Sequence, residues 1–453
     1  MTSERIVQPT KQPPSVAGTF LGIEEAVLRG MLRPSKLFFL FAALMSLFLA
    51  LGFLAYLRQI LASIGVAGIN NPVNWGVYIT NFVFWVGLAH SGTLISAILF
   101  LFLAKWRTSI NRIAEGMTVI AIMTAGLYPL IHLGRVWVAY YLLPYPNYRQ
   151  LWPNFKSPLL WDVVAITTYM LVSMMFFYLG LLPDVATVRD RSTGLKKTIY
   201  GILSLGWRGG YRQWHHYEMA YLLLAALATP LVISVHSVVS WDFAVSVVPG
   251  WHSTIFAPYF VAGAIFSGVA MIIIVLLPIR KFYELESLIT HRHFDMLSKI
   301  LIFMSLIVTY SYFVESFIAW YSGNVYEQHA YFNRAFGEYS YLFWTMVFFN
   351  CLLPLSLFSH RLRMNLRYVY IVSIGVVIGM WVERFVIIVT SLSEDYNPYA
   401  WGLYFPTLIE WGIMLGTWGL FFLLFISLMK VFPAVAISEL KSQLHREGGE
   451  THE

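Results

Sequence analysis

IFAPYFVAGAIFSGVAMIIIVLLPI, residues 255–279, contains no charged side chain. An α-helix rises 1.5 Å per residue, so about 20 apolar residues cross a hydrocarbon core of about 30 Å. Nine other apolar runs have similar length, near 37–57, 74–103, 113–131, 159–182, 217–238, 297–320, 340–358, 368–390 and 405–429. The sequence therefore predicts an all-α integral membrane protein with ten transmembrane helices.

The basic residues between these runs fall on alternate loops. Of the 30 Lys and Arg residues, 24 belong to the termini and to alternate loops with their flanking helix ends, and five belong to the opposite loops. Only Arg384 lies inside a span. Cytoplasmic loops of membrane proteins carry such an excess, so we expect both termini in the cytoplasm. The net charge of +7 follows from this bias, and a nucleic-acid partner is not needed to explain it.

The membrane domain shows a weak internal repeat. A shift of 176 residues places Trp75 on Trp251 and Gly92 on Gly268, and a shift of 183 aligns span 4 with span 8. The shift spans four helices, which predicts two parallel four-helix bundles related by an axis along the membrane normal. The predicted organisation begins with a cytoplasmic N-terminal segment (1–34), in which either an amphipathic helix before Pro34 or a plain tail is open. A ten-helix domain (35–430) follows, with bundles at about 74–238 and 255–390 plus two peripheral helices. A cytoplasmic C-terminal tail (431–453) completes it.

The single cysteine, Cys351, excludes several kinds of redox centre. It cannot form an internal disulfide or supply a cysteine-ligated iron–sulfur cluster, and no C-x-x-C-H motif is present for covalent haem. We therefore expect no haem, iron–sulfur cluster or other metal in this chain. Metal centres needed for redox work would belong to a partner.

The polar residues that indicate a function most clearly lie where spans 3 and 4 reach the outer surface. Span 3 ends in YPLIHLGRVW (128–137) and span 4 begins with SPLLWD (157–162), so His132 and Asp162 should lie at similar depth. An imidazole titrates near neutrality and a carboxylate stabilises its charged form, so the pair is suited to accepting a proton. Arg135 could fix Asp162 as an anion or bind a carbonyl oxygen. A plain ion pair that tethers the 132–158 loop is the structural alternative.

Ionisable residues inside a membrane are costly, which makes each one a functional candidate. Those predicted to be buried here are His90, Glu115, Glu218, His236, Glu315, Glu383, Arg384 and Glu410. A hydrogen-bonded packing role is equally open for His90, and a structural ion pair for Glu383 and Arg384. Glu115 and Glu218 lie near the inner helix ends, where their side chains could reach the interface. We expect Asp242 and His252 to be solvated.

The chain resembles the polysulfide-reductase or NrfD-type membrane proteins. The segments that carry this resemblance are TNFVFWVGLAHSGTLIS (80–96), KWRTSINR (105–112), PLIHLGRVW (129–137) and NFKSPLLWD (154–162). Ten spans instead of eight, and similarity over nearly the whole chain, point to the larger members of the family. Among these the chain is most similar to the quinol-oxidising membrane protein of bacterial alternative complex III. The alternative is the second, related ten-helix membrane protein of the same complex.

The resemblance implies a quinol-binding component of a respiratory or photosynthetic complex in the bacterial cytoplasmic (inner) membrane. Such proteins oxidise quinol, here menaquinol, near the periplasmic face and release protons there. Electrons pass to a peripheral iron–sulfur subunit and then to c-type cytochrome subunits, and a second NrfD-like membrane subunit is expected in the complex, together with lipids. The resemblance assigns catalysis to His132 and Asp162.

Further positions are implied less directly by the same resemblance. Quinol-binding residues would be Asn81, Tyr128, Arg135, Trp137 and Trp161. A proton path through the bundles, which would translocate protons, would use His90, Glu115, Glu218, Glu315, Glu383 and Arg384.

Three other protein classes remain open from the sequence. A b-type cytochrome needs two facing histidines at one depth for each haem, and only His132 and His236 suggest an outer pair, while His90 lacks an evident partner. A secondary transporter would fit the repeat, although its polar residues would gather at the midplane. A structural anchor for peripheral subunits would not need the pair His132 and Asp162.

Overall fold

The computed structural model describes residues 20–32, 36–144 and 153–442. Within those ranges it contains ten helices long and apolar enough to cross a membrane, which confirms the predicted class. Seven of these spans are single α-helices: α2 (Lys36–Ala62), α5 (Asn111–His132), α6 (Pro158–Asp190), α8 (Tyr211–Ala244), α9 (Phe256–Phe282), α10 (His291–Ser322) and α17 (Leu408–Val431). The other three contain a change of helix type. They are Val77–Leu101 (α3, Val77–Thr93, a π-helical turn and α4, Leu99–Leu101), Ser340–Phe358 (beginning with α12, Ser340–Val347) and Leu366–Ser393 (from α15, Leu366–Phe385, to α16, Ser391–Ser393).

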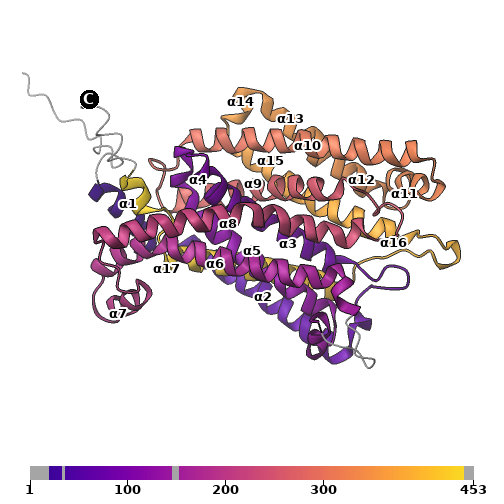
Figure 1. The fold of residues 1–453 in the computed structure, drawn as a ribbon, viewed down its shortest axis with the longest axis horizontal. Helices are drawn as coiled ribbons and strands as arrows, with labels where there is room; N and C mark the ends of the chain where they lie inside the picture. Colours follow the sequence, from indigo (N-terminus) through magenta and orange to yellow (C-terminus); the bar gives the residue numbers. More distant parts are fainter. Residues whose placement is uncertain (1–19, 33–35, 145–152, 443–453) are drawn as a thin grey trace, which may run out of the picture.

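The spans alternate in direction between two ends of an elongated molecule (Figure 1). The end that carries Lys36, Arg112, Arg191 and Lys430 is called the basic end, and the opposite one the His132 end. α1 (Phe20–Leu32) and α7 (Gly194–Leu203) lie at the basic end, on the left of Figure 1. α11 (Val325–Phe336) lies at the His132 end, on the right.

The predicted repeat corresponds to two similar bundles. In bundle one, α3, α5, α6 and α8 pack in cyclic order, and in bundle two α9, α10, the span that begins with α12, and α15 pack in the same order. The equivalent helices α3 and α9 also pack against each other, so they form the centre of the molecule. α2 and α17 pack together at the periphery, as expected for the first and last spans.

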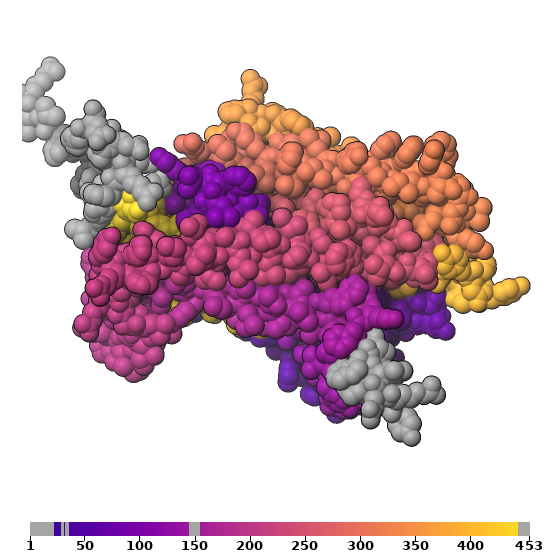
Figure 2. Space-filling model, in the orientation of Figure 1, coloured from indigo at the N-terminus to yellow at the C-terminus, as the bar shows by residue number. Residues whose placement is uncertain are grey.

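Small residues allow the two central helices to approach closely. Every residue of α3 is buried. A Cβ atom added to Gly268 of α9 would lie only 2.2 Å from Ser91 Oγ of α3, so this contact requires glycine. Side chains of α8 and α10 cover much of the face seen in Figure 2. The polar residues of α3 and α9 are therefore held away from lipid.

The chain ends that the structure describes pack on the basic end. α1 buries Ile23 and Val27, in agreement with the amphipathic helix predicted before Pro34. Glu24 of α1 accepts a hydrogen bond from Arg191 at 2.6 Å and also pairs with Lys441. Within the predicted C-terminal tail, residues 434–437 are almost completely buried. Residues 1–19, 33–35, 145–152 and 443–453 lie outside the described part of the chain.

Candidate functional site

His132 is the last residue of α5 and is half-buried. Its ring lies edge-on to Tyr78 of α3, with 6.5 Å between ring centroids, and its Nδ1 has no hydrogen-bond partner among the described residues. Tyr78 donates its hydroxyl hydrogen to Gln59 of α2, and Gln59 Nε2 donates to the carbonyl of Ile131 at 2.8 Å. Three helices thus fix the backbone next to His132 while the imidazole Nδ1 stays available.

Asp162 lies near the start of α6 and is 4% exposed. No ion pair joins it to His132, and no nitrogen or hydroxyl donor of the described residues reaches either carboxylate oxygen. It instead lies within hydrogen-bonding reach of the Asp242 carboxyl group on α8. The expected direct pair between His132 and Asp162 is therefore not formed in this structure, and Asp162 forms an acidic pair with Asp242.

The acidic pair is part of a repeated Trp–Asp arrangement that sequence reasoning missed. Trp161 and Trp241 precede the two aspartates and meet edge to face, with centroids 6.2 Å apart. Asp242 was expected to be solvated because the apolar run ends near residue 238, but α8 continues to Ala244 and half-buries it. The dipeptide Trp–Asp at 161–162 and again at 241–242 was the available sequence signal.

The five predicted quinol-binding residues divide into a buried and a surface group. Asn81 accepts a hydrogen bond from Trp381 of α15 at 2.7 Å, which joins the two bundles, and its Nδ2 is without a partner among the described residues. The hydroxyl of Tyr128 lies 2.6 Å from that of Thr417. Asn81 and Tyr128 therefore lie inside the protein.

The surface group comprises Arg135, Trp137 and Trp161. Arg135 is exposed, and Trp137 is 65% exposed. The indole of Trp161 donates to the carbonyl of Phe155 at 3.0 Å. Arg135 forms no ion pair with Asp162 in the described structure. These three residues lie on the outside of the bundle.

His90 has a partner that the sequence did not reveal. Its ring meets that of His236 edge to face, with centroids 4.6 Å apart, and both side chains are fully buried. His90 Nδ1 lies 2.7 Å from the carbonyl of Val86, while His90 Nε2 and both nitrogens of His236 have no partner among the described residues. α8 ends at Ala244, about two turns beyond His236, so this histidine lies deeper than its apolar run suggested.

The contact between the two imidazoles bears on the cytochrome alternative. Rings that touch edge to face leave no gap for a flat porphyrin between them, so His90 and His236 in this arrangement are not axial ligands of one haem. Among the described residues, no group of three or more His, Cys, Asp or Glu side chains could hold a metal ion.

A buried ionic network occupies bundle one near the basic end. Arg112 is completely buried and pairs with Glu115 at 2.7 Å and with Asp184 at 3.0 Å, and it also donates to the carbonyl of Gly180. Tyr221 donates to Glu115 at 3.1 Å. Sequence reasoning identified Glu115, counted Arg112 with a loop and its flanking helix ends, and did not single out Asp184. The network thus holds one guanidinium group between two carboxyl groups.

Residues of the C-terminal segment contribute further hydrogen bonds and an ion pair to this network. The backbone N–H and hydroxyl of Ser438 donate to Asp184 at 3.0 and 2.9 Å. Glu439 pairs with Arg107 at 2.9 Å and accepts from Asn111. The segment 434–441 therefore covers the basic end of bundle one. Glu218, by contrast, is exposed on α8 and does not belong to an interior path, which corrects its predicted role.

Bundle two contains its own buried polar cluster. Glu383 pairs with Arg384 at 3.0 Å and accepts from Tyr312 and from Asn350. The guanidinium of Arg384 lies over the ring of Phe260, 4.3 Å from its centroid. Phe260 also contacts His236, so the cluster adjoins the histidine pair of bundle one. Glu315 lies apart from this pair. It is buried on α10, and its Oε1 has no partner among the described residues.

Comparison with known proteins identifies the family. Residues 65–393 match the model of the family described as "Polysulphide reductase, NrfD". The chain belongs to the NrfD family. The matched range includes both bundles and every predicted site residue, so the family assignment made from the sequence is confirmed.

Three curated relatives are named as components of reductases or oxidoreductases. A dimethyl sulfoxide reductase membrane protein of Halobacterium salinarum is 28% identical over 233 residues, 51% of this chain and 49% of the relative, so the match spans about half of that protein's length. A selenate reductase component of Mesobacillus selenatarsenatis is 22% identical over 90% of this chain and 96% of the relative. The Hdr-like menaquinol oxidoreductase integral membrane subunit of Archaeoglobus fulgidus is 23% identical over 86% and 93%. This chain is accordingly a multi-pass membrane protein of the NrfD family.

Proposed function

We propose that this chain oxidises a quinol at the His132 end. The observation that carries the proposal is a set of buried polar atoms without partners at that end of an NrfD-family protein. Protein interiors rarely leave such atoms unpaired, so they indicate a place for a polar ligand. Among the described residues, these atoms include His132 Nδ1 and Asn81 Nδ2, and no nitrogen or hydroxyl donor reaches either carboxylate oxygen of Asp162 or Asp242 Oδ1.

The residues present can account for the protons of the reaction. Oxidation of a quinol to a quinone breaks two O–H bonds and releases two protons and two electrons. His132 Nδ1 accepts one proton. Asp162 and Asp242 accept the other, because two adjacent carboxyl groups repel when both are charged and readily share a proton. The electrons leave to iron–sulfur centres of a peripheral subunit docked over this end, and then to c-type cytochrome subunits.

The distribution of charge supports the orientation of the chain in the membrane, and the relatives support the class of substrate. The basic end faces the cytoplasm by the positive-inside rule, so the His132 end faces the periplasm and both termini are cytoplasmic. Menaquinol is the preferred quinol, because one relative of nearly equal length is named a menaquinol oxidoreductase subunit. Ten spans favour the quinol-oxidising membrane protein of an alternative complex III. The related ten-helix membrane protein of that complex is the second possibility, and whichever of the two this chain is not would be its membrane partner.

Two buried clusters extend from the site toward the cytoplasm and support proton translocation. His90 and His236 lie at mid-depth of bundle one and adjoin Arg384 and Glu383 of bundle two. A cavity of about 10 Å³, large enough for one water molecule, lies between Thr93, Ser173 and Glu115. Glu115 then leads to Arg112 near the basic end. Glu315 adds an ionisable group in bundle two, and Glu218 is no longer part of this path.

The test is quinol oxidation by the intact complex carrying single substitutions. His132→Ala and Asp162→Asn should each lower turnover roughly 10²–10⁴-fold, the usual value of a positioned acid or base. Asp242→Asn should act like Asp162→Asn, and the double variant should be little worse than either, because the pair works as a unit. His252→Ala is the matched control, since His252 is exposed at the same end.

Assembly must be measured alongside turnover. Normal amounts of complex with low turnover support catalysis at this site. Near-normal turnover in all three variants would refute the proposal and favour a structural anchor. Uptake of a solute by proteoliposomes of the isolated chain would favour the transporter class instead.

A further inference from the structure

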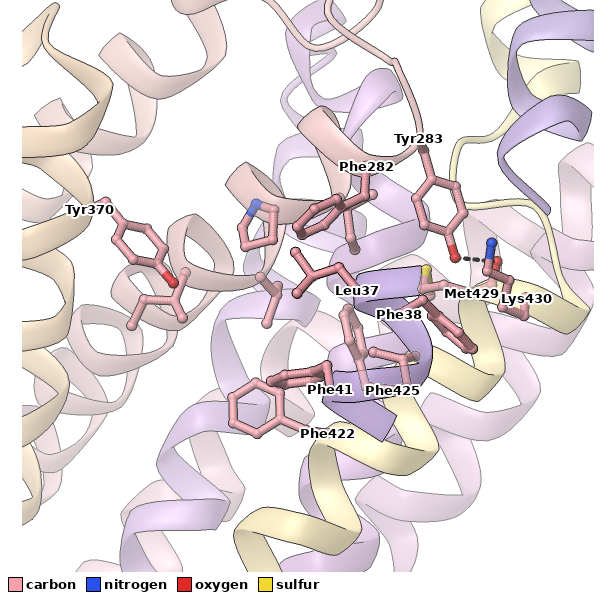
Figure 3. A pocket seen from close by; sticks show the side chains of 15 residues that line it. Leu37, Phe38, Phe41, Phe282, Tyr283, Tyr370, Phe422, Phe425, Met429 and Lys430 are labelled. Atoms are coloured by element: carbon pink, nitrogen blue, oxygen red, sulfur yellow. Dashed lines mark hydrogen bonds between the residues drawn. The ribbon is translucent and has the colours of Figure 1, made fainter. Parts of the chain in front are cut away.

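An apolar groove opens at the basic end, far from the proposed quinol site. It lies between the first turns of α2 and the last turns of α9 and α17, with α15 on one side (Figure 3). Its cavity measures about 340 Å³, within the range of about 300–1,000 Å³ common for small-ligand pockets. The residues that line it are almost all apolar, with Phe41, Phe422 and Phe425 at its floor.

Among the described residues that line this groove, Lys430 is the one with a cationic side chain. It lies near the end of α17, and its ammonium is 4.5 Å from the ring centroid of Tyr283 and 5.2 Å from that of Phe38. The Tyr283 hydroxyl donates to the carbonyl of Met429 at 3.2 Å, which orients the ring under the ammonium. Aromatic faces hold a cation in place, and an ammonium offers three N–H donors. The groove therefore combines a long apolar wall with a positively charged end.

The surroundings of the groove indicate lipid. The neighbouring surface of α2 exposes large apolar side chains, among them Phe39 at 60% and Leu40 at 67%. Lys430 lies within one turn of the end of a membrane-spanning helix, which is the depth of lipid headgroups. Anionic lipids concentrate in the cytoplasmic leaflet, the side to which the basic end is assigned.

The lining argues against a second quinol-oxidation site. No histidine and no carboxylate is among the described residues that line the groove, so it offers no acceptor for quinol protons. The hydroxyl groups of Tyr283 and Tyr370 are its main polar groups besides Lys430. The Tyr283 hydrogen is donated to Met429, and the Tyr370 hydroxyl can donate to an ester or phosphate oxygen.

We propose that this groove binds an anionic glycerophospholipid, with one acyl chain along Phe41, Phe422 and Phe425 and the phosphate at the Lys430 ammonium. The bound lipid would join the peripheral pair α2 and α17 to α9 of bundle two. The proposal concerns a separate region of the molecule and does not depend on quinol oxidation.

The test uses the intact complex in phosphatidylcholine vesicles that contain a small fraction of phosphatidylglycerol with a diazirine in one acyl chain. After irradiation, labelled peptides are mapped by mass spectrometry. Adducts are expected within 274–282 and 422–430. Lys430→Gln should reduce this labelling about fivefold, the effect of about 1 kcal/mol per basic residue near anionic lipid. Lys196→Gln, an exposed lysine of α7 at the same end, is the matched control and should leave the labelling unchanged.

A second variant and a second lipid probe provide further tests of the proposal. Ile274→Trp fills the groove and should reduce labelling by the phosphatidylglycerol probe and by a matching phosphatidylcholine probe alike, whereas Lys430→Gln should affect mainly the anionic probe. Equal labelling of the wild type and both groove variants would overturn the proposal. Loss of labelling on addition of a menaquinone analogue would also overturn it, because the groove would then hold an isoprenoid chain.

Discussion

Replacing Gly268 with alanine tests the contact between the two bundles. The added Cβ would lie 2.2 Å from Ser91 Oγ, 2.5 Å from Ser91 Cβ and 2.9 Å from the carbonyl oxygen of Leu88. Ordinary contact begins at 3.4 Å, so the contact with Ser91 Cβ requires α3 and α9 to separate locally by about 0.9 Å. The hydroxyl of Ser91 can rotate, but its Cβ and the Leu88 carbonyl cannot. Overpacking costs about 1–3 kcal/mol, and the rigid neighbours favour the upper value, which raises the unfolded fraction roughly 100-fold.

Gly87→Ala provides a control on the same interface. Its Cβ would lie 3.6 Å from the Cα of Ala264 and 3.6 Å from Ser267 Oγ, which are ordinary contacts. Unfolding of the purified chain in mixed detergent micelles, followed by tryptophan fluorescence, gives both free energies. Adding Ser91→Gly to Gly268→Ala should restore most of the loss, because it removes two of the three close atoms. Equal stability of the two alanine variants would show that α3 and α9 do not pack as described.

Two other predictions concern the basic end and the orientation. Arg112→Met should lower the free energy of unfolding by about 3–5 kcal/mol because it leaves the carboxylates of Glu115 and Asp184 buried without their cation, and Glu115→Gln added to it should recover part of the loss in the same assay. A variant that unfolds like the wild type would contradict the ionic network. In a Cys351→Ser background, a membrane-impermeant thiol reagent added from the periplasm should label Val325→Cys of α11 and miss Lys196→Cys of α7. The reverse pattern would invert the topology.

The ten spans and their order could be predicted because hydropathy records where lipid surrounds a helix. Helices, however, continue past the hydrocarbon into water or into other parts of the protein. α6 extends to Asp190 and α8 to Ala244, well beyond their apolar runs. Asp242 lies in the extension of α8 and was therefore expected to be solvated, while Asp184 lies in that of α6 and was not singled out. Composition alone does not distinguish a polar helix end from a loop.

The sequence predicted at which end of the molecule the candidate site lies better than it predicted which side chains contact each other there. His132 and Asp162 do lie at the same end, as their places on antiparallel helices require. Which side chains meet depends on helix rotation, and a single sequence does not specify rotation when polar residues are few. His90 therefore faces His236, and Asp162 faces Asp242.

The contacts of Ser438 and Glu439 have a consequence for biosynthesis. Asp184 and Arg107 precede their partners Ser438 and Glu439 by more than 250 residues, so these partners are translated much later. Until those residues emerge from the ribosome, the inserted first bundle holds a buried carboxylate whose hydrogen bonds are incomplete. Completion of this bundle thus requires translation to reach residues 438 and 439, so a product that terminates before them lacks these contacts and presents membrane quality-control proteases with an unfinished bundle.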